Sequence, residues 1–304
     1  MTYREVFEEG KGALAAVGIE EAELDARLLL EFVCGTDRNT LLVHDERPVT
    51  ATEEVTYREL IGKRAKRIPL QHLTGVQDFM GLEFEVNEHV LIPRQDTEIL
   101  VEEALQELHD GMRVLDMCTG SGCILISLLR YSNDCTGVGA DISEEALQVA
   151  ERNTKKLLVN VTGSGLITES VLDGSASAGD ESPAVFIQSD LFEKVEGKFD
   201  MIVSNPPYIC TEVIQTLMPE VREHEPLQAL DGSADGLLFY RRIIEDSIRY
   251  LKKGGMLFFE IGYDQGEAVK NLMEQAGYLE VHVVKDYAGL DRVVSGTLEF
   301  GVTT

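Results

Sequence analysis

The segment Val114-Leu115-Asp116-Met117-Cys118-Thr119-Gly120-Ser121-Gly122 has the pattern of a short apolar strand that turns sharply into a helix. Its two glycines allow the backbone to turn tightly and to approach a ligand closely. The helix that begins near Cys123 directs its free N–H groups and the positive end of its dipole toward this turn, which suits a carboxylate or phosphate. A tight turn before a helix can have the same residues without binding anything, so the segment needs support from its surroundings.

Around this segment, from residue 112 onward, short apolar strands alternate with amphipathic helices. This alternation predicts an α/β fold with a Rossmann-like, doubly wound parallel sheet. The connection Lys285–Asp291 is too short for a helical crossover, so we expect the last of the seven strands to be antiparallel. The expected strands are Arg113–Met117, Gly137–Asp141, Ala184–Gln188, Phe199–Ser204, Gly255–Ile261, Leu279–Val284 and Arg292–Phe300.

Three helices are expected between the strands. The first covers Glu144–Asn153, with Ser143 as its N-cap. The second carries Tyr240, Ile243, Ile244, Ile248 and Leu251 and ends at Lys252-Lys253-Gly254-Gly255, and the third carries Val269, Leu272, Met273 and Ala276 and stops at Gly277.

The region before residue 75 predicts helices only. Leu24, Leu28, Leu29, Phe32 and Val33 recur at helical spacing before Gly35, and a second helical run covers Ala51–Arg67. We then expect a β-hairpin of strands 81–86 and 89–92, turned at Asn87-Glu88, and a helix opened by Asp96 or Thr97. The expected organisation is a helical domain over 1–74, a hairpin linker over 75–95 and an α/β domain over 96–304. Residues 162–183 predict an exposed loop.

Composition and charge exclude several classes of function. The 304 residues include 27 Lys and Arg but 54 Asp and Glu, a formal net charge of −27, which repels nucleic-acid phosphates. The five cysteines form no CxxC pair, so neither a disulfide framework nor a metal site is indicated. No signal peptide and no apolar run of about 18 residues is present. We expect a cytoplasmic protein without bound metal, membrane or direct nucleic-acid contacts, and a monomer.

Acidic residues after successive strands indicate which cofactor the turn binds. A nicotinamide-type fingerprint needs a third glycine where this chain has Leu125. Asp116 instead precedes the turn, where it could bind an ammonium or a bridging water, and Asp141 ends the next strand, where it could accept two ribose hydroxyls. Asp190 follows the strand after that, and Leu191-Phe192 could flank an adenine. These residues fit a cofactor that carries a ribose, an ammonium and a carboxylate but no pyrophosphate. S-adenosylmethionine is such a cofactor, so the sequence predicts that the turn binds it.

The tetrapeptide Asn205-Pro206-Pro207-Tyr208 follows the buried strand Phe199–Ser204 and carries the catalytic prediction. Ligands of open α/β sheets bind at the carboxyl ends of strands, which puts this segment beside the turn. Prolines have no N–H, so the Asn205 oxygen and the Pro206 carbonyl can each accept one hydrogen of a planar –NH2 group. Tyr208 offers a face for a flat amide or base. The same residues could instead form a simple proline turn.

The chain resembles the HemK/PrmC family of protein-(glutamine-N5) methyltransferases, which modify the glutamine of the Gly-Gly-Gln motif of class I peptide chain release factors. The resemblance covers nearly the whole chain. Its motifs are 25–30 (DARLLL), 69–75 (PLQHLTG), 91–98 (LIPRQDTE), Asn205–Tyr208, 224–226 (HEP), 235–237 (DGL) and 285–293 (KDYAGLDRV).

The resemblance implies a class I methyltransferase fold and a helical domain that helps to dock the release factor. Together with the residue patterns it assigns the cofactor to Asp116, Cys118, Thr119, Gly120, Ser121, Gly122, Asp141, Asp190, Leu191 and Asn205. It assigns the substrate glutamine to Asn205, Pro206, Pro207 and Tyr208, with Asn205, Pro206 and Tyr208 catalytic. The chain departs from the family at Cys118, where glycine is usual, at Leu191, where some members have an aromatic residue, and in a longer 162–183 loop.

Two other functions remain open at this stage. A nucleic-acid methyltransferase acting on adenine N6 or guanine N2 would share the tetrapeptide, because an exocyclic amine presents the same two hydrogens; the acidic surface argues against it. A non-catalytic cofactor-binding or assembly module would keep the fold, but the intact tetrapeptide argues against that function.

Overall fold

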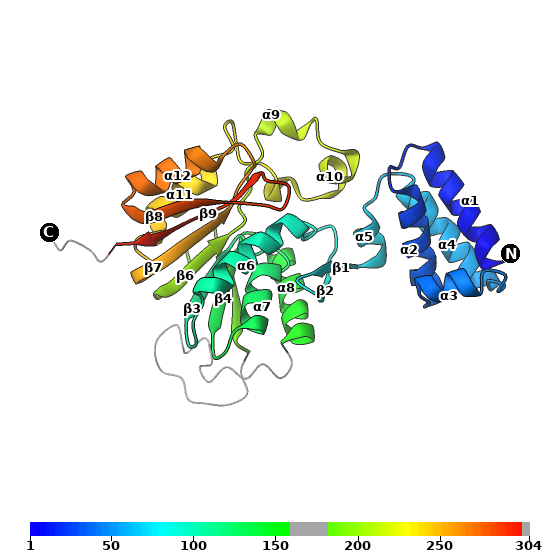
Figure 1. The fold of residues 1–304 in the computed structure, drawn as a ribbon, viewed down its shortest axis with the longest axis horizontal. Coiled ribbons are helices and arrows are strands. Elements are labelled where there is room, and N and C mark those ends of the chain that lie inside the picture. Colours follow the sequence, from blue (N-terminus) through cyan, green and yellow to red (C-terminus); the bar gives the residue numbers. More distant parts are fainter. Residues whose placement is uncertain (159–181, 300–304) are drawn as a thin grey trace. The chain divides into compact units, whose positions relative to one another are not determined.

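A computed structural model describes residues 1–158 and 182–299 of the chain. These residues form two compact units (Figure 1): residues 1–76 with 218–224, and residues 77–217 with those from 225 onward. The first unit begins where the expected helical domain does, but it also takes in the segment 218–224 from far along the sequence. Residues 162–181 of the expected loop lie outside the described residues.

The first unit is built from short helices. They are α1 (Tyr3–Ala16), α2 (Ala22–Cys34), α3 (Arg38–Val43), α4 (Ala51–Arg64), α5 (Leu70–Thr74) and, from the later segment, α10 (Pro219–His224). Capping boxes at Thr2 and Thr50 start α1 and α4, and Gly35 ends α2 in the left-handed conformation, with φ of 55°. The expected helices are confirmed, although α4 ends three residues earlier than predicted.

The buried face of α2 differs from the one expected. Leu24 and Phe32 are exposed, whereas Ala26, Leu29 and Leu30 lie in the core of this unit. Asp25 shares the buried face. The large apolar residues predicted the helix correctly but not its buried stripe, because an acidic residue with a buried partner occupies part of that stripe.

The hairpin is formed by earlier residues than predicted, because the expected first strand is its second strand. Its strands are β1 (Val76–Phe79) and β2 (Leu82–Glu85), joined at Met80 and Gly81, whose φ angles of 50° and 71° suit a two-residue hairpin turn. The expected return strand 89–92 is not a strand. Val90 packs instead with Val86 against buried residues of the later helix α8 (Glu144–Leu157).

The second unit contains a seven-stranded sheet in the order β5-β4-β3-β6-β7-β9-β8. The strands are β3 (Arg113–Met117), β4 (Thr136–Asp141), β5 (Ala184–Gln188), β6 (Phe199–Ser204), β7 (Leu251–Glu260), β8 (Tyr278–Lys285) and β9 (Asp291–Leu298). Neighbours from β5 to β7 are parallel, and β9 is antiparallel to both β7 and β8. All seven expected strands and the antiparallel last strand are confirmed.

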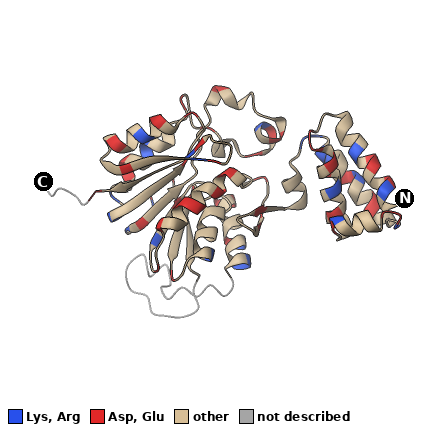
Figure 2. Ribbon diagram, in the orientation of Figure 1, with Lys and Arg blue, Asp and Glu red and all other residues tan. Residues whose placement is uncertain are grey.

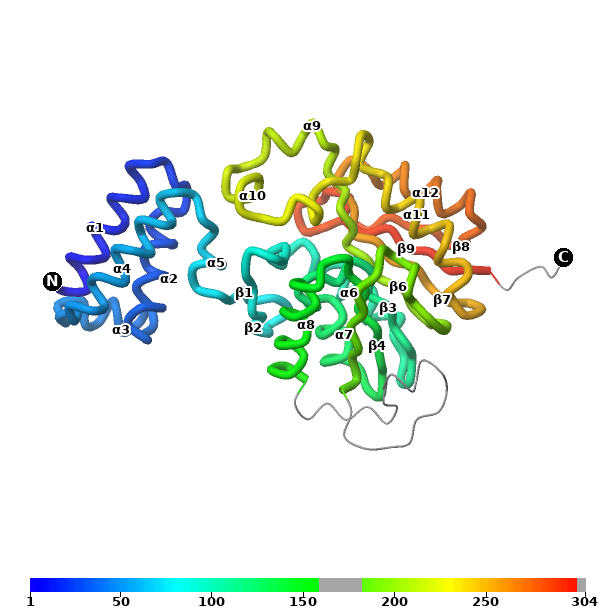
Figure 3. The backbone as a smooth tube through the Cα atoms, turned by 180° about the vertical axis from the view of Figure 1, so that it is seen from behind, coloured from blue at the N-terminus to red at the C-terminus, as the bar shows by residue number. Residues whose placement is uncertain are grey.

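Helices cover both faces of this sheet (Figures 1 and 3). Met201 and Val203 of β6 face a core shared with α6 (Glu98–Glu107) and α7 (Cys123–Tyr131), whereas Ile202 faces a core shared with α11 (Leu238–Ser247) and α12 (Gly266–Gln275). This alternation is the period-two pattern of a strand buried on both sides. The remaining short elements are η1 (Gln95–Thr97), α9 (Thr211–Ile214) and η3 (Leu227–Ala229).

The C-terminal limit expected for one helix is wrong. Helix α11 ends at Ser247, and Leu251 already belongs to β7, where it pairs with Phe199 of β6. The pairing of β6 and β7 shifts register between Phe199 and Met201, so the early part of β7 is irregular. The Lys-Lys-Gly-Gly run therefore lies within the strand rather than at the helix end.

Residues 1–158 and 182–299 contain neither a membrane-spanning helix nor a metal-binding cluster of side chains. No helix there has the length and apolar character needed to cross a membrane. No group of three or more His, Cys, Asp or Glu side chains in those ranges is arranged to hold a metal ion.

Candidate active site

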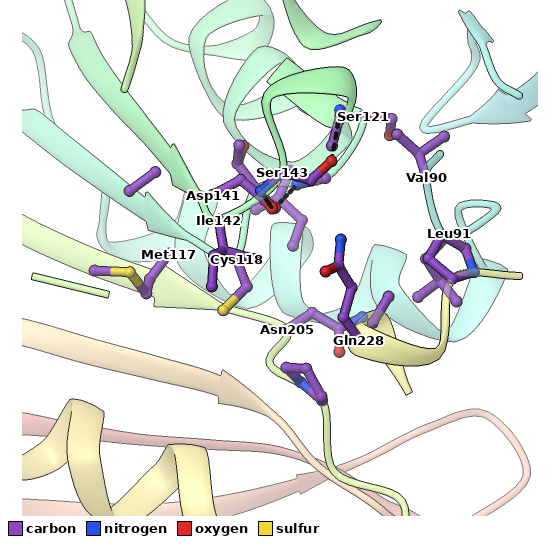
Figure 4. A pocket seen from close by; sticks show the side chains of 18 of the residues that line it. Val90, Leu91, Met117, Cys118, Ser121, Asp141, Ile142, Ser143, Asn205 and Gln228 are labelled. Carbon is purple, nitrogen blue, oxygen red and sulfur yellow. Dashed lines mark hydrogen bonds between the residues drawn. The ribbon is translucent and has the colours of Figure 1, made fainter. Parts of the chain in front are cut away.

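A cavity of about 680 Å³ lies at the carboxyl ends of β3, β4 and β6 (Figure 4). Its walls include the turn after β3, Asp141 to Ser143 after β4, Ser189 to Leu191 after β5, and Asn205 and Pro207 after β6. Residues of the 89–94 segment and of the loop around Gln228 complete it. The expected meeting of strand ends is therefore observed, all within the second unit.

The turn after β3 adopts the left-handed backbone three times. Cys118, Gly120 and Gly122 have φ angles of 63°, 55° and 79°. A Cβ atom at Gly122 would lie 2.9 Å from the Ile126 side chain and 3.1 Å from that of Ala150, so glycine is also needed there for space. Cys118 carries a side chain in a conformation that costs about 1–2 kcal/mol for most residues, which explains why glycine suits this position.

Asp116 supports the turn from behind instead of facing the cavity. The residue is fully buried, and its Oδ2 accepts hydrogen bonds from Thr119 Oγ1 at 2.6 Å and from Leu125 N at 3.3 Å. Its Oδ1 has no partner among the described residues, and burial raises the pKa of this carboxyl to about 7. Asp116 and Gly122 are absent from the cavity wall. Asp116, which was expected to bind an ammonium or a bridging water, therefore lies behind the turn and outside the cavity wall.

Asp141 lies on the wall and also holds the turn. Its Oδ2 accepts the Gly120 N–H at 2.8 Å, and its Oδ1 accepts the Ser143 N–H at 3.0 Å. Ser143 in turn caps α8, because its Oγ accepts the Ala146 N–H at 3.1 Å. Burial raises the pKa of Asp141 while these backbone hydrogen bonds lower it. A carboxylate has about four acceptor positions, so Asp141 can accept further hydrogen bonds from a ligand.

Of the three residues after β5 that were expected to contact the cofactor, two lie on the cavity wall. Asp190 and Leu191 line the cavity, and Asp190 is paired with Arg242 at 2.9 Å. Phe192 points into the core and stacks on Tyr250, with ring centroids 4.6 Å apart. The expectation that Phe192 flanks an adenine is therefore wrong, because its ring already has an aromatic partner in the core.

Only two residues of the tetrapeptide after β6 line the cavity. Asn205 and Pro207 line the cavity, and Pro206 is buried. Asn205 Nδ2 donates to Thr97 Oγ1 at 3.3 Å, which leaves the amide oxygen Oδ1 available. The Tyr208 hydroxyl donates to Glu260 Oε1 at 3.2 Å, so this ring is held by a neighbour instead of lining the wall.

Arg94 and Gln228 are among the cavity residues that had no predicted role. Arg94 Nη2 lies 2.7 Å from each carboxylate oxygen of the buried Glu225, and Arg94 also lines the cavity. Gln228 is exposed, and Figure 4 shows its side chain on the same side of the cavity as Asn205, across from Asp141 and Ser143. Arg94 and Glu225 lie within motifs that carried the family resemblance, and this was the only signal that could have found them.

The comparisons with known proteins cover nearly the whole chain. Residues 5–75 match the PrmC N-terminal domain, and residues 95–220 match the methyltransferase small domain. The release factor glutamine methyltransferase of Geobacter sulfurreducens is 40% identical over 98% of this chain and 97% of its own length. The enzyme of the same name from Caulobacter vibrioides is 39% identical over 97% of this chain and 96% of its own length.

A solved structure supports the fold independently. A methyltransferase from Pyrococcus furiosus aligns with a TM-score of 0.51 at 18% identity, covering 78% of this chain and 99% of its own. Given the extent of the sequence matches and the agreement of the observed sheet with the expected one, the chain belongs to the release factor glutamine methyltransferase family.

Proposed function

We propose that this protein transfers a methyl group from S-adenosylmethionine to the side-chain nitrogen N5 of the glutamine in the Gly-Gly-Gln motif of class I peptide chain release factors. The observation that carries the proposal is the orientation of Asn205. Its amide nitrogen is engaged by Thr97, and its oxygen remains available on the wall of the cavity that also contains Asp141 and the glycine-rich turn.

The residues of the cavity fit S-adenosylmethionine, which supplies an activated methyl group on a sulfonium when bound. Asp141 has acceptor positions left for ribose hydroxyls. Ile142, which is exposed and lines the cavity, and Leu191 offer apolar surface for an adenine. The Thr119 and Gly120 N–H groups of the turn are already bound to Ala140 O and Asp141 Oδ2, so the start of α7, where Cys123 and Ile124 line the cavity, offers the backbone N–H groups for a carboxylate. Asp116 contributes by holding this turn in shape.

The tetrapeptide provides the groups that hold the substrate amide. The Asn205 oxygen and the Pro206 carbonyl each accept one amide hydrogen, which orients the nitrogen and increases its electron density. Pro206 and Pro207 have no N–H groups that would compete for these acceptors. No side chain must remove a proton beforehand, because the amide nitrogen loses it only after methylation.

The charge of the protein favours a protein substrate over a nucleic acid. The net charge is −27, and Figure 2 shows acidic residues on helices of both units. A nucleic-acid methyltransferase must neutralise phosphates along its substrate. We infer that the helical unit docks the release factor, and that the protein acts as a monomer in the cytoplasm, where its substrate works.

Methyl-labelled cofactor tests this function when it is offered together with a purified release factor and total nucleic acid. We expect label in the release factor. Label in nucleic acid alone would establish the exocyclic-amine alternative, and absence of turnover would indicate a non-catalytic module.

A further inference from the structure

Arg94 is held on the cavity wall by a buried acid. Its Nη2 lies 2.7 Å from both Oε1 and Oε2 of Glu225. The Glu225 side chain is 1% exposed, whereas that of Arg94 is 41% exposed and lines the cavity. Burial raises the pKa of the Glu225 carboxyl, and the charge of Arg94 opposes this rise. One nitrogen of the guanidinium is therefore fixed by a partner that cannot itself reach solvent.

Most of the Arg94 donors remain available. A guanidinium has several N–H donors in a rigid fork, and among the described residues it hydrogen-bonds only through Nη2, to Glu225. Of the described residues on the cavity wall, Arg94 is also the only arginine or lysine. An acceptor that enters this part of the cavity meets a donor that is always charged.

Arg94 belongs to the side of the cavity that carries the tetrapeptide. Its carbonyl oxygen accepts the Thr97 N–H at 3.1 Å, and the Thr97 hydroxyl oxygen lies 3.3 Å from Asn205 Nδ2. Burial raises the pKa of Tyr208, and the charge of Arg94 is one of those that oppose the rise. The guanidinium charge therefore acts close to the residues that are proposed to hold the substrate amide.

The substrate amide has one polar atom that the tetrapeptide does not engage. In the proposed function, Asn205 and Pro206 accept the two amide hydrogens, which leaves the amide oxygen. An acceptor that is buried without a donor costs about as much as a lost hydrogen bond. Pro206 and Pro207 have no N–H groups to offer, so the donor must come from another part of the wall.

We propose that Arg94 donates a hydrogen bond to the oxygen of the substrate glutamine amide, and that Glu225 is the positioning residue that holds Arg94 for this contact. The inference rests on the proposed function. Two acceptors and one donor then match all the polar atoms of a primary amide. A glutamate in the same place lacks both hydrogens, so the three contacts together select an amide.

This contact should contribute to substrate affinity more than to the rate of methyl transfer. The amide oxygen is most negative before the reaction, while the nitrogen lone pair is still shared with the carbonyl group. Arg94 therefore holds the bound substrate at least as strongly as the transition state, and such binding affects KM and leaves kcat nearly unchanged.

Binding of two release factors tests the inference. One has the natural Gly-Gly-Gln motif and the other has alanine in place of the glutamine, and both are titrated into protein loaded with S-adenosylhomocysteine. We expect the parent protein to bind the glutamine form more tightly. Arg94→Met should reduce this preference roughly tenfold, the lower end for a hydrogen bond to a charged group, because Arg94 is partly exposed.

Arg152→Met is the matched control. Arg152 is an arginine of similar exposure, 47%, that is paired with Glu85 and does not line the cavity. Its replacement should leave the preference for glutamine as it is in the parent protein. In steady-state kinetics, Arg94→Met should raise the KM for the release factor roughly tenfold at nearly constant kcat. The dissociation constant of S-adenosylmethionine should stay within about twofold.

A second variant covers the possibility that Arg94→Met does not fold. Loss of Arg94 leaves Glu225 buried without its partner, which is strongly destabilising. Adding Glu225→Gln removes that charge, and the double variant should show the same reduced preference.

Several outcomes would overturn the inference. They are a parent protein without preference for glutamine, an unchanged preference in a folded variant, an equal loss for both release factors, and a loss confined to cofactor binding. If the parent protein leaves the Gly-Gly-Gln glutamine unmodified in the presence of S-adenosylmethionine, the proposed function fails instead.

Discussion

Replacing Asp141 with alanine removes the carboxylate that joins the cofactor turn to the end of β4. In the intact protein, this carboxylate accepts the N–H groups of Gly120 at 2.8 Å and of Ser143 at 3.0 Å. Its remaining acceptor positions are proposed to receive the ribose hydroxyls. Alanine should therefore weaken S-adenosylmethionine binding directly and also loosen the turn.

The size of the effect follows from the kind of hydrogen bond that is lost. A hydrogen bond to a charged group contributes about 1.5–3 kcal/mol. Water can replace part of the lost contacts because Asp141 faces the cavity, so we expect a net loss within that range and not twice it. Since about 1.4 kcal/mol is a factor of ten, the dissociation constant should rise roughly 10- to 150-fold.

Isothermal titration calorimetry with S-adenosylmethionine measures this constant. Glu144→Ala is the matched control, because it removes an exposed carboxylate three residues away that is not part of the cavity wall. The control should bind as the parent protein does. A folded Asp141→Ala variant whose dissociation constant stays within twofold of the parent would refute the assignment of Asp141 to the cofactor.

Three further predictions concern catalysis, pH dependence and stability. Asn205→Ala should lower kcat by roughly 10²-fold or more while leaving cofactor affinity largely intact; steady-state kinetics with near-normal kcat would rule out its role. Burial raises the pKa of Asp116 from an ordinary value of 3.8 to about 7, so its contribution to stability is present at low pH and is lost as pH rises through 7. Asp116→Asn should remove a change of at most about 4 kcal/mol in unfolding free energy between pH 4 and 8, and parallel curves from urea titrations of both proteins would contradict this. Arg64→Met should destabilise the helical unit by about 3–5 kcal/mol, because Arg64 donates to Asp25 at 2.7 Å and to Glu220 at 3.0 Å and all three are buried; an unchanged urea midpoint would show that this cluster contributes little.

The sheet could be predicted from the sequence because its strands are buried on both faces. A continuous apolar run such as that around Met201 and Ile202 is typical of such a strand, and the short connection after Lys285 limited how the last strand could pair. The hairpin could not be predicted in the same way. Its turn depends on Met80 in a left-handed conformation, which residue type alone does not indicate.

The site was only partly predictable, because position in the chain does not tell where a side chain points. Asp116 and Asp141 both end strands, yet only Asp141 lies on the cavity wall. Phe192 adjoins Leu191 in sequence but packs into the core. Such differences depend on packing partners that come from other parts of the chain.

Thr97 and Glu260, which form hydrogen bonds with the tetrapeptide, had no predicted role at the site. Thr97 was identified only as a possible start of a helix and as part of the 91–98 motif, and Glu260 only as a residue of the expected strand Gly255–Ile261. They come together with Asn205 and Tyr208, which lie 108 and 52 residues away in the chain, only through folding. Long-range contacts of this kind become visible only in the folded structure.

Mass spectrometry of a class I release factor incubated with this protein and S-adenosylmethionine tests the central claim most directly. Peptide fragmentation should locate one added methyl group on the glutamine of the Gly-Gly-Gln motif, and a release factor with asparagine in place of that glutamine should remain unmodified. Methylation at another residue, or an unmodified glutamine after incubation with folded and cofactor-binding protein, would contradict the account.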